Sequence, residues 1–73
     1  MDFNEWRSEF PNGTRVLWHD KLLKKDWLPG SIVGAQEFCG EMMLKFRLDE
    51  DPPREKLAHR LSIKHRDLLK KLQ

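Results

Sequence analysis

The sequence predicts a mainly β domain: a small, strongly curved sheet or barrel, with a short N-terminal helix and an amphipathic C-terminal helix. Three observations lead to this fold class. The chain has 73 residues, which is enough for one domain spanning residues 1–73. Residues 42–48 alternate apolar and polar side chains with a period of two, which is typical of a half-buried strand. Residues 57–72 repeat leucine at helical spacing instead.

The chain begins with a predicted helical cover segment, residues 1–10. Phe3, Trp6 and Phe10 recur at a spacing that places them on one face of a short helix. The following residues 11–13, Pro-Asn-Gly, are a turn sequence that ends this segment. We expect the aromatic face to cover an open edge or end of the sheet.

Three strands are predicted within the β core, residues 13–51. Residues 14–19 and 27–33 are rich in side chains that favour strands. Residues 42–48 form the third strand, in which one face is apolar. Residues 34–40 then supply a hairpin connection of moderate length between the second and third strands.

The last segment, residues 52–73, is predicted to form a basic amphipathic helix. Asp51 is a suitable N-cap, and Pro52 suits the first turn. Alternating apolar side chains over residues 57–63 leave a second interpretation open, in which a strand is followed by a short helix. In the helical interpretation one apolar face includes Leu57, Leu61, Leu68 and Leu72.

Charge is distributed unevenly along the chain, although the net charge is only +2. Residues 1–51 contain seven Lys or Arg and ten Asp or Glu, whereas residues 52–73 contain seven and two. An acidic body favours cationic partners, and a basic segment favours phosphates or acidic protein surfaces.

Several functional classes receive no support from the residues. The single cysteine, Cys39, has no partner for an internal disulfide, and the cysteine and histidines lack zinc-ligand spacing. No enzyme motif is visible, so we expect a non-enzymatic protein without metal or cofactor. No apolar run approaches membrane-spanning length, and residues 1–5 lack the features of a signal peptide. We therefore expect an intracellular protein without membrane partners.

The β core resembles a Tudor-like domain, and similar openings occur in chromo-barrel domains, a related group of SH3-like barrels. The resemblance covers about residues 10–51. It rests on Phe10-x-x-Gly13-x-Arg15-Val16-Leu17, Asp26-Trp27-Leu28-Pro29-Gly30-Ser31-Ile32-Val33, Leu44-Lys45-Phe46 and Asp49-Glu50-Asp51. The family's fourth and fifth strands are not evident in the sequence, because a helical pattern occupies their place.

This resemblance implies a chromatin-associated nuclear protein that binds methylated lysine or arginine, typically on a histone tail, in a cage of aromatic side chains. A methylated ammonium keeps its charge, is poorly hydrated and is attracted to aromatic faces. Trp18, Trp27 and Phe46 match the family's aromatic positions. Asp49 and Glu50 match the place where the family often has an acidic group near the cation.

The same aromatic residues have a structural interpretation. Trp18 and Trp27 line a cage or fill a small core, and the residues alone do not decide between these roles. Phe46 is in phase with Leu44 on the apolar face of its strand, which favours the core.

Two further functions follow from the C-terminal segment. In the first, a basic helix face binds DNA or RNA phosphates through Arg60, Lys64, Arg66, Lys70 and Lys71. In the second, the leucine face docks a protein partner or a second copy of the chain through Leu57, Leu61, Leu68 and Leu72. A packed helix with a solvated exterior is the structural alternative to both.

Overall fold

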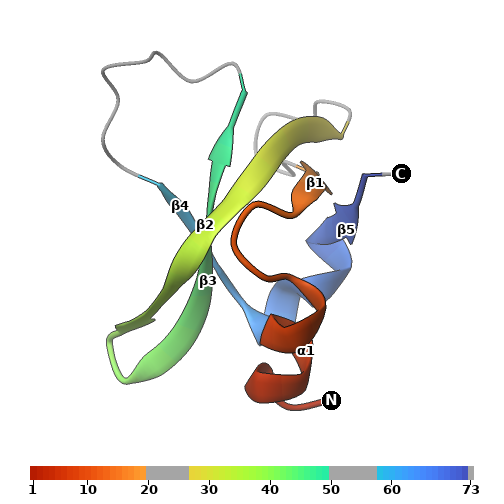
Figure 1. The fold of residues 1–73 in the computed structure, drawn as a ribbon. Coiled ribbons are helices and arrows are strands. Elements are labelled where there is room, and N and C mark those ends of the chain that lie inside the picture. The colour runs from red at the N-terminus through yellow and green to blue at the C-terminus, as the bar shows by residue number, and fades with distance from the viewer. Residues whose placement is uncertain (20–26, 50–57, 73) are drawn as a thin grey trace.

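The computed structural model describes residues 1–19, 27–49 and 58–72. In chain order the elements are the helix α1 (Phe3–Glu9), the strands β1 (Arg15–Trp18), β2 (Leu28–Phe38), β3 (Glu41–Leu48) and β4 (His59–Ser62), the 3-10 helix η1 (Ile63–Leu68) and the strand β5 (Leu69–Lys71). The strands form one antiparallel sheet in the order β4-β3-β2-β1-β5 (Figure 1). The chain is therefore mainly β, with a short N-terminal helix.

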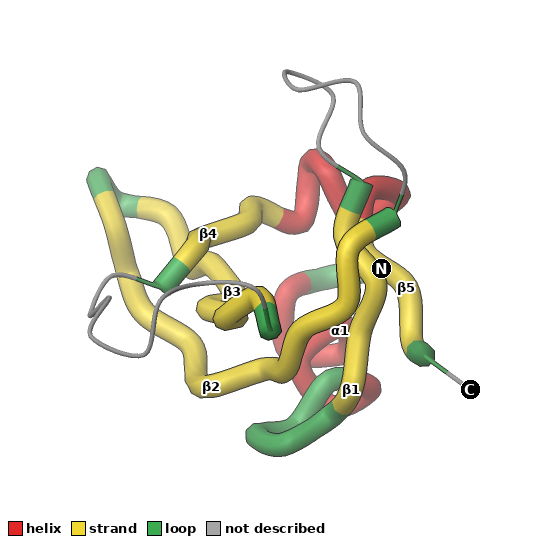
Figure 2. The backbone as a smooth tube through the Cα atoms, turned by 90° about the horizontal axis from the view of Figure 1, so that it is seen from above, coloured by secondary structure: helices red, strands yellow, loops and turns green. Residues whose placement is uncertain are grey.

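The sheet is open, although it bends strongly around the core. β4 and β5 are its two edge strands and do not pair with each other in the described part of the chain. Seen from above, η1 links these two edges while the strands curve around the interior (Figure 2). The prediction of a curved sheet or barrel is therefore corrected to a curved open sheet.

The predicted amphipathic helix over residues 52–73 is wrong for its described part. Residues 58–72 contain β4, η1 and β5, while residues 52–57 lie outside the described residues. β4 pairs with the free edge of β3 and β5 pairs with the free edge of β1. Both pairings satisfy backbone groups that an unpaired strand edge would leave open. The strand over 57–63 followed by a short helix, which the sequence left as an alternative, is closer to this structure.

The reason for this error is that the leucine spacing also fits a strand, a 3-10 turn and another strand. Leu61 of β4 lies opposite Leu44, and Leu69 of β5 lies opposite Trp18. Ser62 is the N-cap of η1, and its hydroxyl accepts a hydrogen bond from the Lys64 N–H at 3.2 Å. Most helical stability in proteins comes from tertiary packing rather than from local propensity, so two sheet edges that need partners decide the outcome.

The connection between β2 and β3 is tighter than the predicted loop over residues 34–40. β2 continues to Phe38 and shifts register between Ile32 and Gly34, at a bulge or irregularity. The turn consists of Cys39 and Gly40, whose φ angles are +53° and +80°. Two consecutive positive φ angles are the signature of a two-residue type I′ hairpin, which matches the twist of the flanking strands.

The hydrophobic core lies between the concave side of the sheet and α1. Trp6 and Phe10, from the N-terminal segment, are both buried there. Asp2 caps α1, because its carboxylate accepts a hydrogen bond from the Glu5 N–H at 2.9 Å. The buried sheet residues of the core are Val16, Ile32, Leu44, Phe46, Leu48, Leu61 and Leu69.

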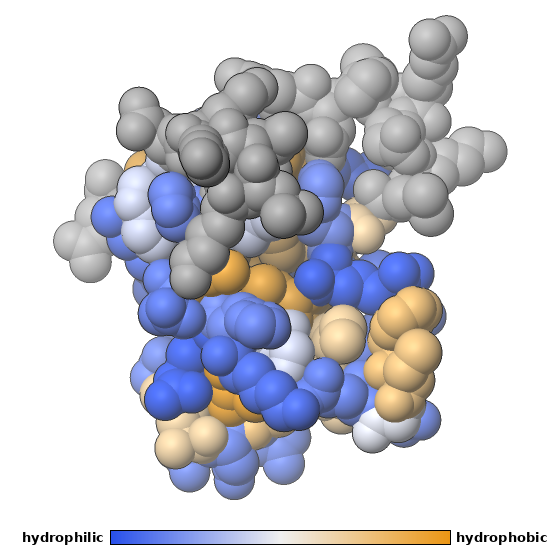
Figure 3. Space-filling model, turned by 180° about the vertical axis from the view of Figure 1, so that it is seen from behind, coloured by the Kyte–Doolittle hydropathy of each residue, from blue (hydrophilic) through white to orange (hydrophobic). Residues whose placement is uncertain are grey.

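The two sides of the sheet are called the core face and the outer face. Successive strand residues point to opposite sides, whereas directly opposed residues on neighbouring strands share a side. Leu44 and Phe46 of β3 therefore mark the core face, while Lys45 and Arg47 mark the outer face. A space-filling view from behind shows a mainly hydrophilic surface, with an apolar strip on the side of the β2–β3 hairpin (Figure 3).

Candidate functional site

One end of the sheet collects aromatic side chains from distant parts of the sequence. β1 ends at this end of the sheet with Trp18, and β4 begins there with His59. β3 passes Phe46 just before it ends, and Trp27 immediately precedes β2. Antiparallel pairing makes this convergence necessary, because the end of one strand lies beside the start of its neighbour.

Three of these rings, Trp18, Phe46 and His59, form a ring cluster on the core face. The ring centroids of Trp18 and His59 are 5.1 Å apart with planes tilted by 36°, and those of Trp18 and Phe46 are 5.3 Å apart. His59 stacks on Phe46 at 5.4 Å. Phe46 is fully buried, whereas Trp18 and His59 are half-buried. Of the three rings, only those of Trp18 and His59 therefore belong to residues that keep some solvent exposure.

The Trp18 indole also carries an unusual polar group. Its Nε1 is buried and has no hydrogen-bond partner in the described part of the chain. A buried indole N–H normally finds an acceptor, because losing the hydrogen bond to water is costly. Trp18 thus combines an apolar ring surface with an unused donor.

Trp27 lies on the outer face, away from the ring cluster. The ring centroids of Trp27 and His19 are 5.4 Å apart, and the Lys70 ammonium lies 4.3 Å from the Trp27 ring centroid. Lys70 is opposite Leu17, the residue before Trp18, and neighbouring residues of a strand point to opposite sides. Of the three predicted aromatic residues, the structure brings Trp18 and Phe46 together and separates Trp27 from them.

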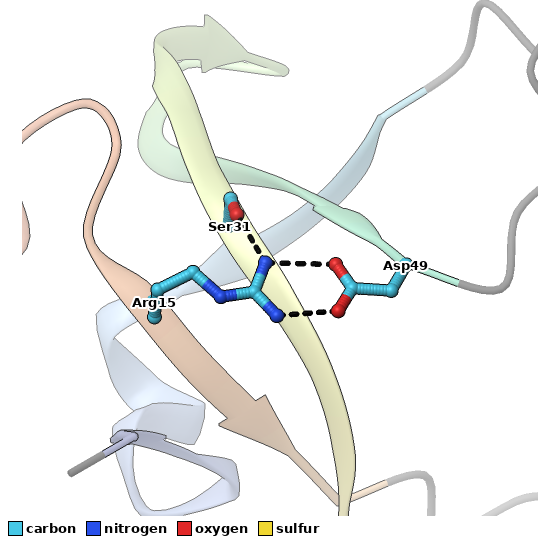
Figure 4. A network of polar contacts seen from close by, with 3 residues as sticks. All are labelled: Arg15, Ser31 and Asp49. Carbon is cyan, nitrogen blue, oxygen red and sulfur yellow. Dashed lines mark hydrogen bonds and ion pairs between the residues drawn. The ribbon is translucent and has the colours of Figure 1, made fainter.

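Asp49, one of the two acidic candidates, is occupied by Arg15. The two side chains form a bidentate ion pair in which both guanidinium NH groups donate to the carboxylate, one of them at 2.8 Å (Figure 4). The same guanidinium donates to the Ser31 hydroxyl at 2.7 Å, so the contact ties β1 and β2 to the end of β3. The Arg15 hydrogen bond lowers the pKa of Asp49, and the reciprocal bond raises the pKa of Arg15. Glu50 lies outside the described residues.

The five basic residues assigned to a helix face occupy three different elements. Arg60 is on β4, Lys64 and Arg66 are on η1, and Lys70 and Lys71 are adjacent on β5. Lys70 and Lys71 therefore point to opposite sides of the sheet. The structure does not bring the five together on one surface.

The four leucines predicted to form a docking face are also dispersed. Leu61 is 7% exposed and belongs to the core, and Leu68 is half-buried. Leu72 is 39% exposed and Leu57 lies outside the described residues. Because the helix is absent from the described part of this segment, no continuous leucine stripe forms there.

His59 is the ring-cluster member that sequence reasoning did not select. Its alternation with Leu61 was visible and marked it as a strand residue facing the same side. The sequence alone did not show that His59 lies opposite Phe46, because the register between β3 and β4 is set by the tertiary structure.

The described residues contain no group of three or more His, Cys, Asp or Glu side chains placed to hold a metal ion. Within the same residues, no helix has both the length and the apolar character needed to cross a membrane. Comparison with protein-family models, with curated proteins and with solved structures found no significant match.

Proposed function

We propose that this chain is a non-enzymatic binding module that recognises a cationic side chain at the half-buried rings of Trp18 and His59. The proposed partner is a basic peptide carrying methylated lysine or arginine, such as a histone tail, in a nuclear, chromatin-associated setting. The partner class comes from the Tudor-like resemblance of residues 10–51. The position of the site comes from the ring cluster.

The observation that carries this proposal is the arrangement of two half-buried rings over a buried third ring. The ring centroids of Trp18 and His59 are 5.1 Å apart with planes tilted by 36°, and both rings pack against the buried Phe46 ring. A cation over the face of Trp is attracted by the ring quadrupole, with about 0.5–1 kcal/mol at exposed sites and more after desolvation. Methylation makes desolvation of the ammonium easier while its charge is kept.

Two features of the chain support the resemblance behind the partner class. The described sheet has five strands, and the last two occupy the segment in which the family's fourth and fifth strands were not evident from the sequence. Trp18 and Phe46, two of the matched aromatic positions, are in contact at 5.3 Å. His59 is the third ring of the cluster, whereas Trp27, the third matched aromatic position, lies on the outer face.

The test is a proton–nitrogen NMR titration with two matched peptides, one with trimethyllysine and one with unmodified lysine. The chain has three tryptophans, each in a different environment: Trp18 is in the ring cluster, Trp27 is on the outer face and Trp6 is in the core. We expect the methylated peptide to move the Trp18 indole signal selectively. Trp6 and Trp27 serve as internal controls.

Two variants sharpen this titration. His59→Ala should weaken binding of the methylated peptide about three- to fivefold, because it removes one of the two half-buried rings of the site. Trp27→Ala should leave the affinity unchanged, because its ring lies on the other side of the sheet. Movement of the Trp27 indole alone, or unmoved indoles with both peptides, would refute the proposed site.

A further inference from the structure

A second charged and aromatic surface lies on the outer face, over β2, β3 and β4. We call it the basic outer surface and define it by Phe38, Lys45, Arg47 and Arg60. Register places all four on the same side: Lys45 is directly opposite Arg60, and Phe38 is opposite Glu41, which shares the outer side of β3 with Lys45. The ring cluster lies on the other side of the sheet, so this inference does not depend on the proposed function.

The pairing of Lys45 with Arg60 opposes two positive charges across neighbouring strands. Like charges directly opposite each other destabilise a sheet. Neither side chain forms an ion pair within the part of the chain that the structure describes. Bringing an anion to this position would relieve a repulsion that the free protein carries.

Two acidic residues of the described part of the chain lie close to this surface, and both are paired with other cations. Glu41, on the same side of β3, forms an ion pair with Lys64 at 3.6 Å. Asp49 is held by Arg15. The charge of Lys45 and Arg60 is therefore not neutralised by either of these neighbouring carboxylates, and the surface has a positive excess.

An exposed aromatic ring and an uncovered stretch of strand adjoin these cations. Phe38 is 44% exposed, and the Arg60 guanidinium lies 4.7 Å from its ring centroid. Gly34 lies opposite Lys45, and a Cβ placed on it would meet nothing within 4 Å. The strand surface beside Lys45 is thus open to a ligand.

We propose that the basic outer surface binds single-stranded nucleic acid, with backbone phosphates on Lys45 and Arg60 and a base stacked on Phe38. Cations that follow a backbone, combined with an exposed aromatic ring, are the recurring features of single-strand binding. A paired base cannot present its face to Phe38, so the ring favours a single strand over a duplex. Arg47 lies two residues from Lys45 on the same side of β3.

The experiment measures fluorescence anisotropy of a labelled oligothymidine at several salt concentrations, with the folded full chain. The double variant Lys45→Glu, Arg60→Glu should bind about tenfold more weakly or worse, and the salt slope should shrink by about 1.4 for two lost phosphate contacts. This variant keeps two like charges opposite each other, so its thermal midpoint should stay close to that of the wild type. The matched control, Arg66→Glu with Lys71→Glu, makes the same charge change on η1 and β5 and should retain most of the affinity.

Two single variants separate binding from folding. Lys45→Glu turns the repulsive pair into an attractive one, so we expect weaker binding together with a thermal midpoint raised by about 2–4 °C. Phe38→Ala should weaken single-strand binding about fivefold or more through the lost stacking. A duplex of the same length should bind more weakly than the single strand.

Four results would overturn the proposal. These are absence of wild-type binding at low salt, equal losses in the double variant and its matched control, unchanged binding by Phe38→Ala, and tighter binding of the duplex. Circular dichroism of each variant establishes that the comparison is made between folded proteins.

Discussion

The core face and the outer face of this sheet use the same residue types for different purposes. On the core face, Phe46 is fully buried and packs against Trp18 and His59. On the outer face, Phe38 is 44% exposed and its ring contacts a guanidinium. The difference shows that an aromatic side chain in this small domain acquires its role from the face it occupies, and that its type alone does not assign it to a cage or to a core.

The two faces also differ in their polar groups: charged pairs lie on the outer face, and a buried indole N–H lies on the core face. The outer face carries a bidentate ion pair, Arg15 with Asp49, and a repulsive pair, Lys45 with Arg60. The core face has one tryptophan N–H that lacks a partner among the described residues. Stability is therefore concentrated in the packing of the core face, whereas the outer face has charges that packing does not require.

The largest expected effect comes from removing the same side chain on each face. Phe46→Ala should lower the free energy of unfolding by about 3–5 kcal/mol, because it leaves a cavity in a fully buried site. Phe38→Ala should change it by about 0.5 kcal/mol or less. Urea denaturation followed by circular dichroism measures both. If Phe46→Ala does not fold, Phe46→Leu supplies the comparison, with an expected loss of about 1–2 kcal/mol. Equal losses for Phe46 and Phe38 would contradict the distinction between the faces.

The two glycines inside β2 give a sharper comparison within a single strand. A Cβ on Gly30 would lie 2.5 Å from the Arg47 carbonyl oxygen, whereas a Cβ on Gly34 meets nothing within 4 Å. Gly30→Ala should therefore cost about 1–3 kcal/mol of stability, because the β2 and β3 backbones must move apart. Gly34→Ala should be neutral or stabilise by up to about 0.5 kcal/mol. Thermal denaturation of the two variants checks the difference. A larger loss of stability for Gly34→Ala than for Gly30→Ala would contradict the close approach of β2 to β3 at Gly30.

The smallest expected effect concerns the ion pair on the outer face and its dependence on pH. Arg15 lowers the pKa of Asp49 in the folded protein, so the pair stabilises the fold above the unfolded pKa of the carboxylate. This contribution is lost as the pH falls through the folded pKa. Between about pH 6 and about pH 2.5 the wild type should therefore lose more stability than Asp49→Asn. Urea midpoints at both pH values measure this loss of stability, and Asp67→Asn on η1 is the control. If Asp49→Asn lost as much stability in acid as the wild type, the ion pair would not be the source of the acid dependence.

The N-terminal helix and the third strand show how far local sequence can predict this fold. Trp6 and Phe10 share an apolar face, which is buried in the core. The alternation around Leu44 and Phe46 predicted which side of β3 is apolar, and both residues are fully buried. These features depend on neighbours in the sequence, so their periodicity is sufficient to detect them.

The candidate sites were less accessible to prediction for a physical reason. Trp18 and Phe46 were selected from the sequence and are in contact, but the addition of His59 depends on the β3–β4 register. The separation of Trp27 depends on which side of the sheet each residue faces near the β1–β2 connection. The opposition of Lys45 and Arg60 likewise exists only after β4 has paired with β3.

The sequence by itself determined a small domain with an apolar helix face, an alternating third strand and an acidic body followed by a basic segment. Only the tertiary structure decided that residues 59–71 form two strands and a 3-10 turn. Their leucine spacing fits a helix equally well, and local propensity does not separate the two. The free edges of β1 and β3 do separate them, because pairing satisfies their backbone groups and buries Leu61 and Leu69 at the same time.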